Sequence, residues 1–365
     1  MGSSHDRAGL SVLALIPRPR GKWGAVEVYR ILTPLSYINR KSRAKCGWMS
    51  LGDAMLKIAS EGRTAFGHVD VVVLHKTLIE RRLATGRDSA LLREMGATVV
   101  YEVDDDYSGK YRPATDDRPG DWMGVLDHAD AVTVTTEALR DRVLETHDLP
   151  VHVLPNQIDY YVFADACIRA DRTIEGDPTI MVAGTRTHYE DWRVLAGVVP
   201  RIQEKYPNAR FVVAGYTPHY LAEHDVESLP PVPYIQYPSL LRQADILLKP
   251  LVPDDGFNLC KSDIGALEGW SARRMLHQRS IFGGCAVIAT DCPVYNGTIK
   301  NRKNGLLVEH TEDAWYDAIS ELIEDTVLRR TLQKNGHRDA RERSMSVQWT
   351  KWHRVYRQLA EGGTT

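Results

Sequence analysis

Short apolar runs alternate with amphipathic stretches along nearly the whole chain. In the first half, the runs that predict strands cover residues 10–16, 69–75, 97–103, 131–136 and 151–155. They are rich in Val, Ile and Leu without strict alternation, which is typical of parallel strands covered on both faces. Helical stretches fall between them, such as residues 78–96, where Gly96 is placed to end a helix. The pattern predicts a doubly wound α/β domain.

A second series of apolar runs predicts another domain of the same kind. Its strands are expected at residues 179–184, 210–215, 233–237, 245–251, 285–290 and 305–309. The connection between the two series is rich in charged and turn-forming residues, which is typical of a linker. From Asp313 to about Leu359 the pattern is helical, and this stretch contains Trp315, Trp349, Trp352 and Tyr356.

The predicted fold class is therefore α/β, with two Rossmann-like domains facing across a cleft. We expect an N-terminal domain at residues 1–155, a linker at 156–178 and a C-terminal domain at 179–345. Residues 346–365 are expected to form a helix that crosses back to the N-terminal domain. Ligands of such folds bind beyond the carboxyl ends of the parallel strands, so we expect the binding and catalytic residues in the loops that follow the strands.

Composition narrows the class of protein. A chain of 365 residues with 43% hydrophobic content is long enough for two ordinary domains. The net charge of −2 excludes a globally basic nucleic-acid coat protein but leaves room for a local basic patch. Five scattered cysteines without a CxxC pair indicate reduced thiols. No signal peptide pattern and no run of about 18 apolar residues are present, so we expect a cytoplasmic protein without a transmembrane segment.

Two loops of the C-terminal half could bind an anion. Residues 184–188 follow an apolar strand, where Gly184 would let the backbone approach a ligand and Arg186 could pair with a diphosphate. An ordinary loop with Thr187 capping a helix would give the same pattern. The second loop, GFNLCKSD at 256–263, offers Lys261 as a point charge and Ser262 and Asn258 as hydrogen-bonding groups. A solvated surface loop is the alternative.

The N-terminal half holds an acidic cluster and two basic ones. Asp104, Asp105 and Asp106 follow a predicted strand and could bind a cation, orient a sugar hydroxyl or act as a base; a solvated strand end or a helix cap is the simpler alternative. The basic residues beside the first strand and after the first helix could contact an anionic acceptor, or form a scattered solvated face. They are Arg18, Arg20 and Lys22 with Trp23, and Arg40, Lys41, Arg43 and Lys45.

Several classes of site are absent from the sequence. No His and Cys set has the spacing of a zinc site, and neither a GxSxG elbow nor a GxxxxGK[ST] phosphate loop occurs. GxGxxG does not follow the first strand, which argues against a dinucleotide-dependent dehydrogenase. We interpret His75, at a strand end, and His128 as structural.

Taken together, these segments resemble glycosyltransferases of the GT-B fold, in particular the family 4-like (group 1) branch. The segments that carry the resemblance occur in the expected order: VVVLHKTL, VVYEVDDD, ADAVTVTTEAL with LPNQID, IMVAGTRTHYEDW, and ADILLKPL with FNLCKSD and CAVIATDCPVY. The resemblance implies a donor bound mainly by the C-terminal domain and an acceptor bound by the N-terminal one. It also implies no essential metal, a co-substrate such as a UDP- or GDP-sugar, and a retaining outcome.

The resemblance also implies roles for particular residues. Gly184, Arg186 and Lys261 fall where diphosphate contacts are expected, with Thr185, His188, Asn258 and Ser262 beside them; residues 234–237, including Tyr237, fall where the nucleotide base packs. Glu268 is the nearest match to the ribose-binding Glu, although the insertion at 269–284 would also allow Arg279 to hold that position. Two further departures are Gln157, where the family usually has Gly, and Lys249, which is either an extra phosphate contact or a local peculiarity.

We therefore expect a glycosyltransferase that moves a sugar from a nucleoside-diphosphate donor to a hydroxyl acceptor, with Asp104, Asp105 and Asp106 as the catalytic candidates. An inverting enzyme would need a base, for which Asp104 is the candidate. The basic cluster of Arg18, Arg20, Lys22 and Trp23 is the candidate contact for an acceptor, and basic residues favour an anionic one, such as a nucleic acid or a phospholipid-linked sugar. The alternatives are a DNA glycosyltransferase acting on a hydroxymethyl pyrimidine, a non-catalytic nucleotide-sugar-binding protein, and an epimerase.

Overall fold

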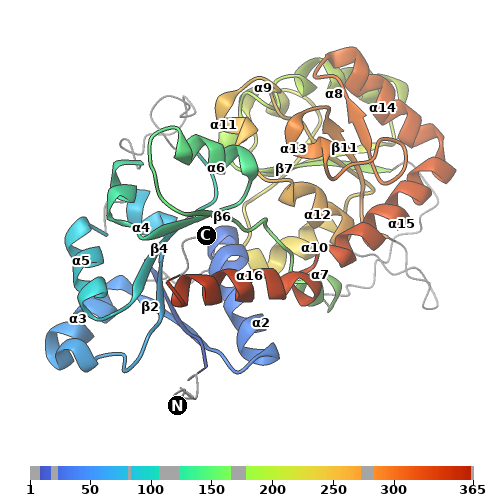
Figure 1. Cartoon of the computed structure of the whole chain (residues 1–365). Coiled ribbons are helices and arrows are strands. Elements are labelled where there is room, and N and C mark those ends of the chain that lie inside the picture. The colour runs from blue at the N-terminus through green and yellow to red at the C-terminus, as the bar shows by residue number, and fades with distance from the viewer. Residues whose placement is uncertain are drawn as a thin grey trace. The chain divides into compact units, whose positions relative to one another are not determined.

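The structure is a computed structural model that describes residues 9–17, 24–80, 84–106, 123–165, 178–272 and 283–362. It divides into two compact units. The first contains the described residues up to Pro155 and those from Gln348 onward, and the second contains those from Asn156 to Val347. Each unit has its own parallel sheet with helices packed against it (Figure 1).

The first unit is built on a six-stranded sheet whose strands are all parallel, in the order β2-β1-β3-β4-β5-β6. The strands are β1 Ser11–Ile16, β2 Lys45–Ser50, β3 Val71–His75, β4 Thr98–Val103, β5 Ala131–Val134 and β6 Val151–Val153. Its helices are α1 Ala25–Glu27, a π-helical turn Val28–Leu32, α2 Thr33–Lys41, α3 Leu51–Glu61, α4 Lys76–Glu80, α5 Gly86–Glu94, α6 Glu137–Leu144 and most of α16 Met345–Ala360, with 3₁₀ turns Gly62–Thr64 and Met123–His128. The doubly wound pattern predicted for this half is confirmed.

One strand of this sheet was missed by the sequence pattern. Strand β2 has the sequence KCGWMS, and its residues pair in register with β1 from Ser11 to Ile16. It is an edge strand with only one buried residue, Ser50, and its Gly and Lys resemble loop residues. An edge strand of this kind gives no apolar run to detect.

A buried ion pair organises the core of the first unit. Arg30, in the π-helical turn, is fully buried, and its Nε donates to Oε1 of Glu102 at 2.5 Å. The same guanidinium donates to the carbonyl oxygen of Leu154 and lies 4.7 Å from the ring centroid of Trp352. The pair therefore ties strand β4, the end of β6 and helix α16 to one point.

His75 shares this interior and is neutral. Its Nε2 lies 3.9 Å from Oε2 of Glu102, and both side chains are fully buried. Burial, together with the charge of Lys76, lowers the pKa of His75 to about 3. Burial raises the pKa of Glu102, and the charge of Arg30 opposes that rise.

The second unit repeats the architecture. Its strands are all parallel in the order β12-β11-β10-β7-β8-β9. They are β7 Thr179–Gly184, β8 Arg210–Gly215, β9 Glu227–Leu229, β10 Ile246–Lys249, β11 Ala286–Thr290 and β12 Leu306–Val308. Its helices are α7 Tyr160–Asp165, α8 Leu195–Lys205, α9 His219–Ala222, α10 Tyr237–Leu241, α11 Gly256–Leu259, α12 Ile264–Ser271, α13 Pro293–Asn296, α14 Glu312–Glu324 and α15 Thr326–Glu342, with 3₁₀ turns Arg186–His188 and Tyr234–Gln236.

The strand predicted at residues 233–237 is wrong. This segment forms the 3₁₀ turn Tyr234–Gln236 and runs directly into helix α10, while the sixth strand of the sheet is β9, a short edge strand. Prolines explain the difference, since Pro233 and Pro238 supply no N–H to a sheet ladder and Pro238 suits the first turn of a helix.

The carboxyl ends of β7 and β8 approach each other so closely that they require glycine. Gly215 has φ +100°, and a Cβ atom there would lie 2.1 Å from the carbonyl oxygen of Gly184. Gly184 itself faces the parallel rings of His188 and Trp192, whose centroids are 5.9 Å apart. A Cβ on Gly184 would lie 2.8 Å from His188 Cδ2.

Replacing Gly215 by Ala should therefore destabilise the second unit by at least about 2 kcal/mol, because the new methyl group meets backbone atoms and the φ angle is unfavourable for Ala. Urea denaturation measures the loss. Gly297→Ala is the matched control: it has open space around its Cα and φ −76°, so its change should stay within about 0.5 kcal/mol. Equal midpoints for the two variants would contradict the prediction.

The buried imidazole of His75 predicts a pH dependence for the first unit. Its pKa is lower in the native state than in the unfolded chain, so its stabilising contribution is complete above about pH 6.5 and is lost as the pH falls toward the native pKa. Between roughly pH 6 and 5 this loss should approach ~1.4 kcal/mol per pH unit in the free energy of unfolding. Removing the imidazole with His75→Asn should flatten that dependence, whereas His68→Asn, at an exposed position, should leave it unchanged.

Candidate functional site

Two loops meet at the carboxyl ends of neighbouring strands in the second unit. Strands β7 and β10 are parallel and pair directly, from Ile246 opposite Ile180 to Leu248 opposite Val182. The loop after β7 contains the 3₁₀ turn Arg186–His188, and the loop after β10 contains helix α11 and Lys261. The two loops singled out in the sequence therefore lie at one edge of one sheet.

Asp191 holds the two loops together. Its Oδ2 accepts a hydrogen bond from Nδ1 of His188 at 2.8 Å, within its own loop. Its Oδ1 accepts from the backbone N–H of Val252 at 2.9 Å and from Nδ2 of Asn258 at 2.6 Å, both in the loop after β10. Nζ of Lys261 lies 4.0 Å from Oδ2. One buried carboxylate thus fixes both loops, and the sequence analysis did not identify it.

Burial and the neighbouring charges set the protonation states at this point. Burial alone would raise the pKa of Asp191, but the hydrogen bond from His188 and the charge of Lys261 hold it below its ordinary value. Burial, followed by the charge of Lys261, lowers the pKa of His188 to about 4. At neutral pH the site therefore combines an ionised Asp191, a cationic Lys261 and a neutral His188. With Nδ1–H bonded to Asp191, Nε2 of His188 is left as an acceptor.

Lys261 is largely buried next to this network. Only 9% of the residue is exposed, and its ammonium lies 4.8 Å from the ring centroid of Phe257 and 3.4 Å from Nδ1 of His188. Such packing restricts the side chain to a narrow range of positions. A cation held in this way at a strand end is arranged to meet an anion.

The predicted residues of the first loop divide into packing and exposed groups. Gly184 allows the His188 and Trp192 rings to pack against the strand end. The hydroxyls of Thr185 and Thr187 lie 2.9 Å apart, and Thr187 does not cap a helix. Arg186 is exposed, with its guanidinium 5.9 Å from the ring centroid of Tyr216. Arg186 is therefore an accessible cation of this loop.

Asn258 and Ser262 shape the second loop. Nδ2 of Asn258 donates to Asp191 and, at 3.2 Å, to the carbonyl oxygen of Val252, so both of its amide hydrogens are used inside the protein. Oγ of Ser262 accepts from Nδ2 of Asn156 at 2.9 Å. The amide of Asn258 is therefore better suited to holding the loop than to donating to a ligand.

Glu268 and Tyr237 lie together in the same unit. Glu268 is in α12 and is almost fully buried. Tyr237, the first residue of α10, donates its phenolic hydrogen to the Glu268 carboxylate; burial and then that charge raise the pKa of Tyr237 well above its ordinary value. Arg279, the alternative for the ribose position, lies outside the described residues, as does most of the insertion around it.

The three aspartates of the first unit differ in burial and in their partners. Asp104 and Asp106 are buried, and Asp105 is half-buried. The Asp104 carboxylate is paired with Lys76, and Oδ2 of Asp106 lies 3.1 Å from Nε of Arg142. Within the part of the chain that the structure describes, no group of three or more His, Cys, Asp or Glu side chains is placed to hold a metal ion.

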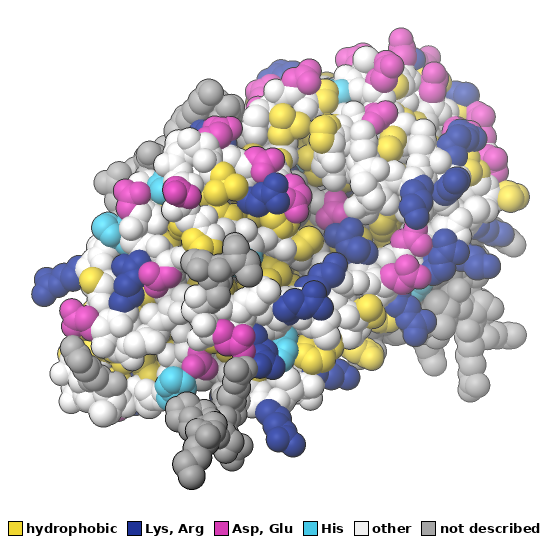
Figure 2. All heavy atoms as spheres, in the orientation of Figure 1, with side chains coloured by type: hydrophobic (Ala, Val, Ile, Leu, Met, Phe, Trp, Pro, Cys, Tyr) yellow, Lys and Arg dark blue, Asp and Glu magenta, His cyan; other side chains and the backbone are white. Residues whose placement is uncertain are grey.

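Of the two basic clusters predicted in the first unit, the structure describes only the second. Arg18, Arg20, Lys22 and Trp23 lie outside the described residues. Arg40 and Lys41 end helix α2, and Lys45 pairs with Ser11, at the first residue of each strand. The second basic cluster therefore lies at the amino end of the sheet, opposite the end where ligands of this fold bind, which favours the alternative of a solvated face. Figure 2 shows acidic and basic side chains interspersed on the visible face.

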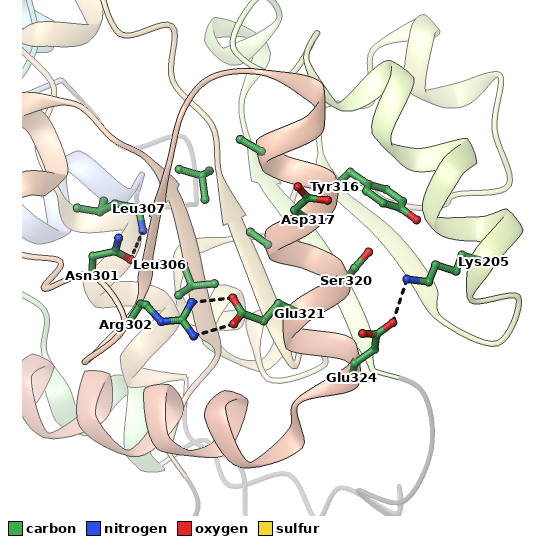
Figure 3. Close-up of a pocket in the computed structure, with 13 residues that line it drawn as sticks. Lys205, Asn301, Arg302, Leu306, Leu307, Tyr316, Asp317, Ser320, Glu321 and Glu324 are labelled. Atoms are coloured by element: carbon green, nitrogen blue, oxygen red, sulfur yellow. Dashed lines mark hydrogen bonds and ion pairs between the residues drawn. The ribbon is translucent and has the colours of Figure 1, made fainter.

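A groove of about 580 Å³ lies elsewhere on the second unit, between strand β12 and helix α14 (Figure 3). Two ion pairs line it: Arg302 with Glu321 at 2.7 Å, and Lys205 with Glu324 at 2.9 Å. The side-chain oxygen of Asn301 accepts the backbone N–H of Leu307 at 3.1 Å. None of the predicted site residues lines this groove.

No helix in the described part of the chain is both long and apolar enough to cross a membrane. Neither a protein-family model nor a curated protein sequence matches the chain. Solved structures do match it. A sucrose-phosphate synthase from Thermosynechococcus elongatus is similar with a TM-score of 0.67 and 12% identity, over 97% of this chain and 100% of that one.

Two other solved structures are similar over nearly their whole length. HepE of Anabaena, in complex with UDP and glucose, has a TM-score of 0.64 at 14% identity, covering 96% of this chain and 100% of its own. A glycosyltransferase of Rickettsia africae has a TM-score of 0.63 at 13% identity, covering 98% and 100%. Together with the two parallel six-stranded sheets, these similarities show that the chain has the GT-B fold, built of two Rossmann-like domains.

Proposed function

We propose that the protein is a glycosyltransferase that takes its sugar from a nucleoside-diphosphate donor. The observation that carries the proposal is Lys261, a largely buried cation held by the Asp191 network where the loops after β7 and β10 meet. Solved proteins of the same fold bind UDP or UDP-glucose, and a uridine diphosphate sugar is therefore the donor we propose. The assignment to the family 4-like branch remains part of this proposal.

In the proposed complex, Lys261 and Arg186 neutralise the donor diphosphate. Lys261 supplies a fixed charge from one loop, and Arg186 supplies an exposed guanidinium from the other, which can bind two phosphate oxygens at once. Gly184 and Thr185 bring their backbone close to the proposed position of the diphosphate. In a water-poor site each cation contributes on the order of 2–4 kcal/mol toward stabilising the leaving diphosphate. This charge neutralisation by side chains is why we propose that no metal is required.

His188 receives a different role because it is neutral. An uncharged imidazole with Nδ1–H bonded to Asp191 presents Nε2 as an acceptor, which suits a hydroxyl of the donor sugar rather than a phosphate oxygen. Glu268, with Tyr237 bonded to it, is the proposed contact for the ribose hydroxyls. Asn258 and Ser262 support the loop that carries Lys261.

The acceptor is proposed to be a hydroxyl compound bound by the first unit, with Asp104, Asp105 and Asp106 at the strand end orienting it. The ion pairs of Asp104 with Lys76 and of Asp106 with Arg142 favour orientation over proton abstraction, because a carboxylate paired with a cation is a weak base. This fits a retaining reaction, in which the leaving phosphate takes the acceptor proton. Nothing in the described residues favours the DNA-directed, epimerase or binding-only alternatives.

The donor site is tested by removing its two cations. Lys261→Ala and Arg186→Ala should each weaken UDP binding at least about tenfold, because each loses one charge-assisted contact to the diphosphate. Isothermal titration with UDP measures the affinity. Lys205→Ala, which removes an exposed lysine paired with Glu324, is the control and should bind like wild type. Wild-type affinity in both cation variants would refute the placement of the site.

The loop-holding role of Asp191 gives a second test. Asp191→Asn removes the charge that fixes His188 and lies near Lys261, so UDP affinity and kcat/KM with a sugar donor should both fall by at least about tenfold. The neighbouring Glu190→Gln change, at an exposed residue paired with Arg193, should have no effect on either quantity. If Asp191→Asn behaved like Glu190→Gln, the network would have no part in binding.

A further inference from the structure

Lys249 is a cation at the end of an otherwise apolar strand. Strand β10 reads ILLK, and its first three residues are fully buried while Lys249 is partly buried. Its Nζ donates to the carbonyl oxygen of Ala183, next to Gly184, at 3.3 Å. Its Cε lies 2.8 Å from where a Cβ on Gly265 would be. The side chain therefore runs between the end of β7 and the first turn of α12.

The surroundings of this ammonium leave part of its bonding capacity unused. A lysine ammonium has three hydrogens, and the Ala183 carbonyl takes one. No carboxylate among the described residues forms an ion pair with it. The charged or titratable groups that act on it are Glu268 from α12, Cys285 before β11, and Lys261 and His188 from the two loops. Lys249 and Lys261 repel each other, and the charge of Glu268 favours the protonated ammonium of Lys249.

Without a bound anion, keeping the Lys249 ammonium at this position lowers the stability of the protein. Burial lowers the pKa of Lys249, and the charge of Glu268 offsets only part of the effect. A leucine or methionine at this position would fill the space without that cost. Two nearby cations and the N-terminal turn of α12, whose backbone N–H groups carry partial positive charge, are together complementary to a group with several negative charges.

We propose that Lys249 is a second cation of the donor site, which binds the diphosphate together with Lys261. The inference rests on the proposed function and adds to it a contact from the strand itself. It also gives Lys249 a positioning role, because its hydrogen bond to Ala183 holds the strand end that leads into Gly184 and Arg186. Gly265 is the residue that makes room for its side chain.

The test compares ligands that differ in phosphate content. Titration of the full-length protein with UDP and with uridine should show that Lys249→Met weakens UDP binding about tenfold and leaves uridine binding unchanged. Lys249→Arg keeps the charge and should restore most of the UDP affinity. Melting temperatures of the free proteins confirm that the variants are folded; if Lys249→Met is unfolded, Lys249→Gln takes its place.

The outcomes separate this inference from the proposed function. If Lys249→Met binds UDP like wild type while Lys261→Ala does not, Lys249 is no donor contact and the proposed function stands. If Lys249→Met weakens UDP and uridine equally, the residue acts only on the structure of the unit, and the inference fails. If wild type binds neither UDP nor any other nucleoside diphosphate, both proposals fail together.

Proton uptake on UDP binding is a second test, which does not depend on a change in affinity. Because the free ammonium has a lowered pKa, a diphosphate that pairs with it should raise that pKa, so that UDP binding takes up protons in alkaline solution. Titrations in buffers of different ionisation enthalpy measure this uptake. It should be present in wild type and reduced in Lys249→Arg, since a guanidinium does not titrate there. Equal uptake in both proteins would overturn the inference.

Discussion

The candidate site depends on one buried carboxylate. Asp191 satisfies donors from both loops beyond β7 and β10, and in doing so it fixes the position of a lysine that neither loop could hold alone. The arrangement follows from the sheet, because parallel neighbouring strands deliver their loops to one edge. A buried carboxylate tolerates such a position only while its hydrogen bonds are complete. The Asp191 carboxylate therefore sets both the geometry of the two loops and the charge around Lys261.

In each unit, a buried charged side chain links segments that are far apart in the sequence. In the first, the guanidinium of Arg30 links Glu102 on β4, the carbonyl of Leu154 after β6 and the ring of Trp352 in α16. In the second, Asp191 links two loops. The two networks differ in their surroundings: that of Arg30 is buried in a core, whereas that of Asp191 includes His188, which shares a 3₁₀ turn with the exposed Arg186. Only the second therefore combines a fixed charge with access for a ligand.

Of the twelve strands in the described residues, apolar runs were sufficient to predict ten, because strands buried on both faces consist of little else. Strands β2 and β9 were missed because they lie at sheet edges and carry few apolar residues, whereas the edge strands β6 and β12 are still apolar. The aromatic and β-branched residues at 234–237 gave a turn the composition of a strand. Lys261 and Arg186 were identifiable from their places after strands. Asp191 was not, because a carboxylate that bonds across 67 residues to Asn258 leaves no local pattern beyond its i,i+3 spacing from His188.

The short strand β12 has a consequence for how copies of the chain behave in solution. An edge strand offers unpaired N–H and C=O groups to any extended peptide, which is a route to aggregation. Here the side-chain oxygen of Asn301 already accepts the backbone N–H of Leu307, and the ion pair of Arg302 with Glu321 lies next to it. Side chains of the same chain thus protect the border of the second sheet against addition of a foreign strand.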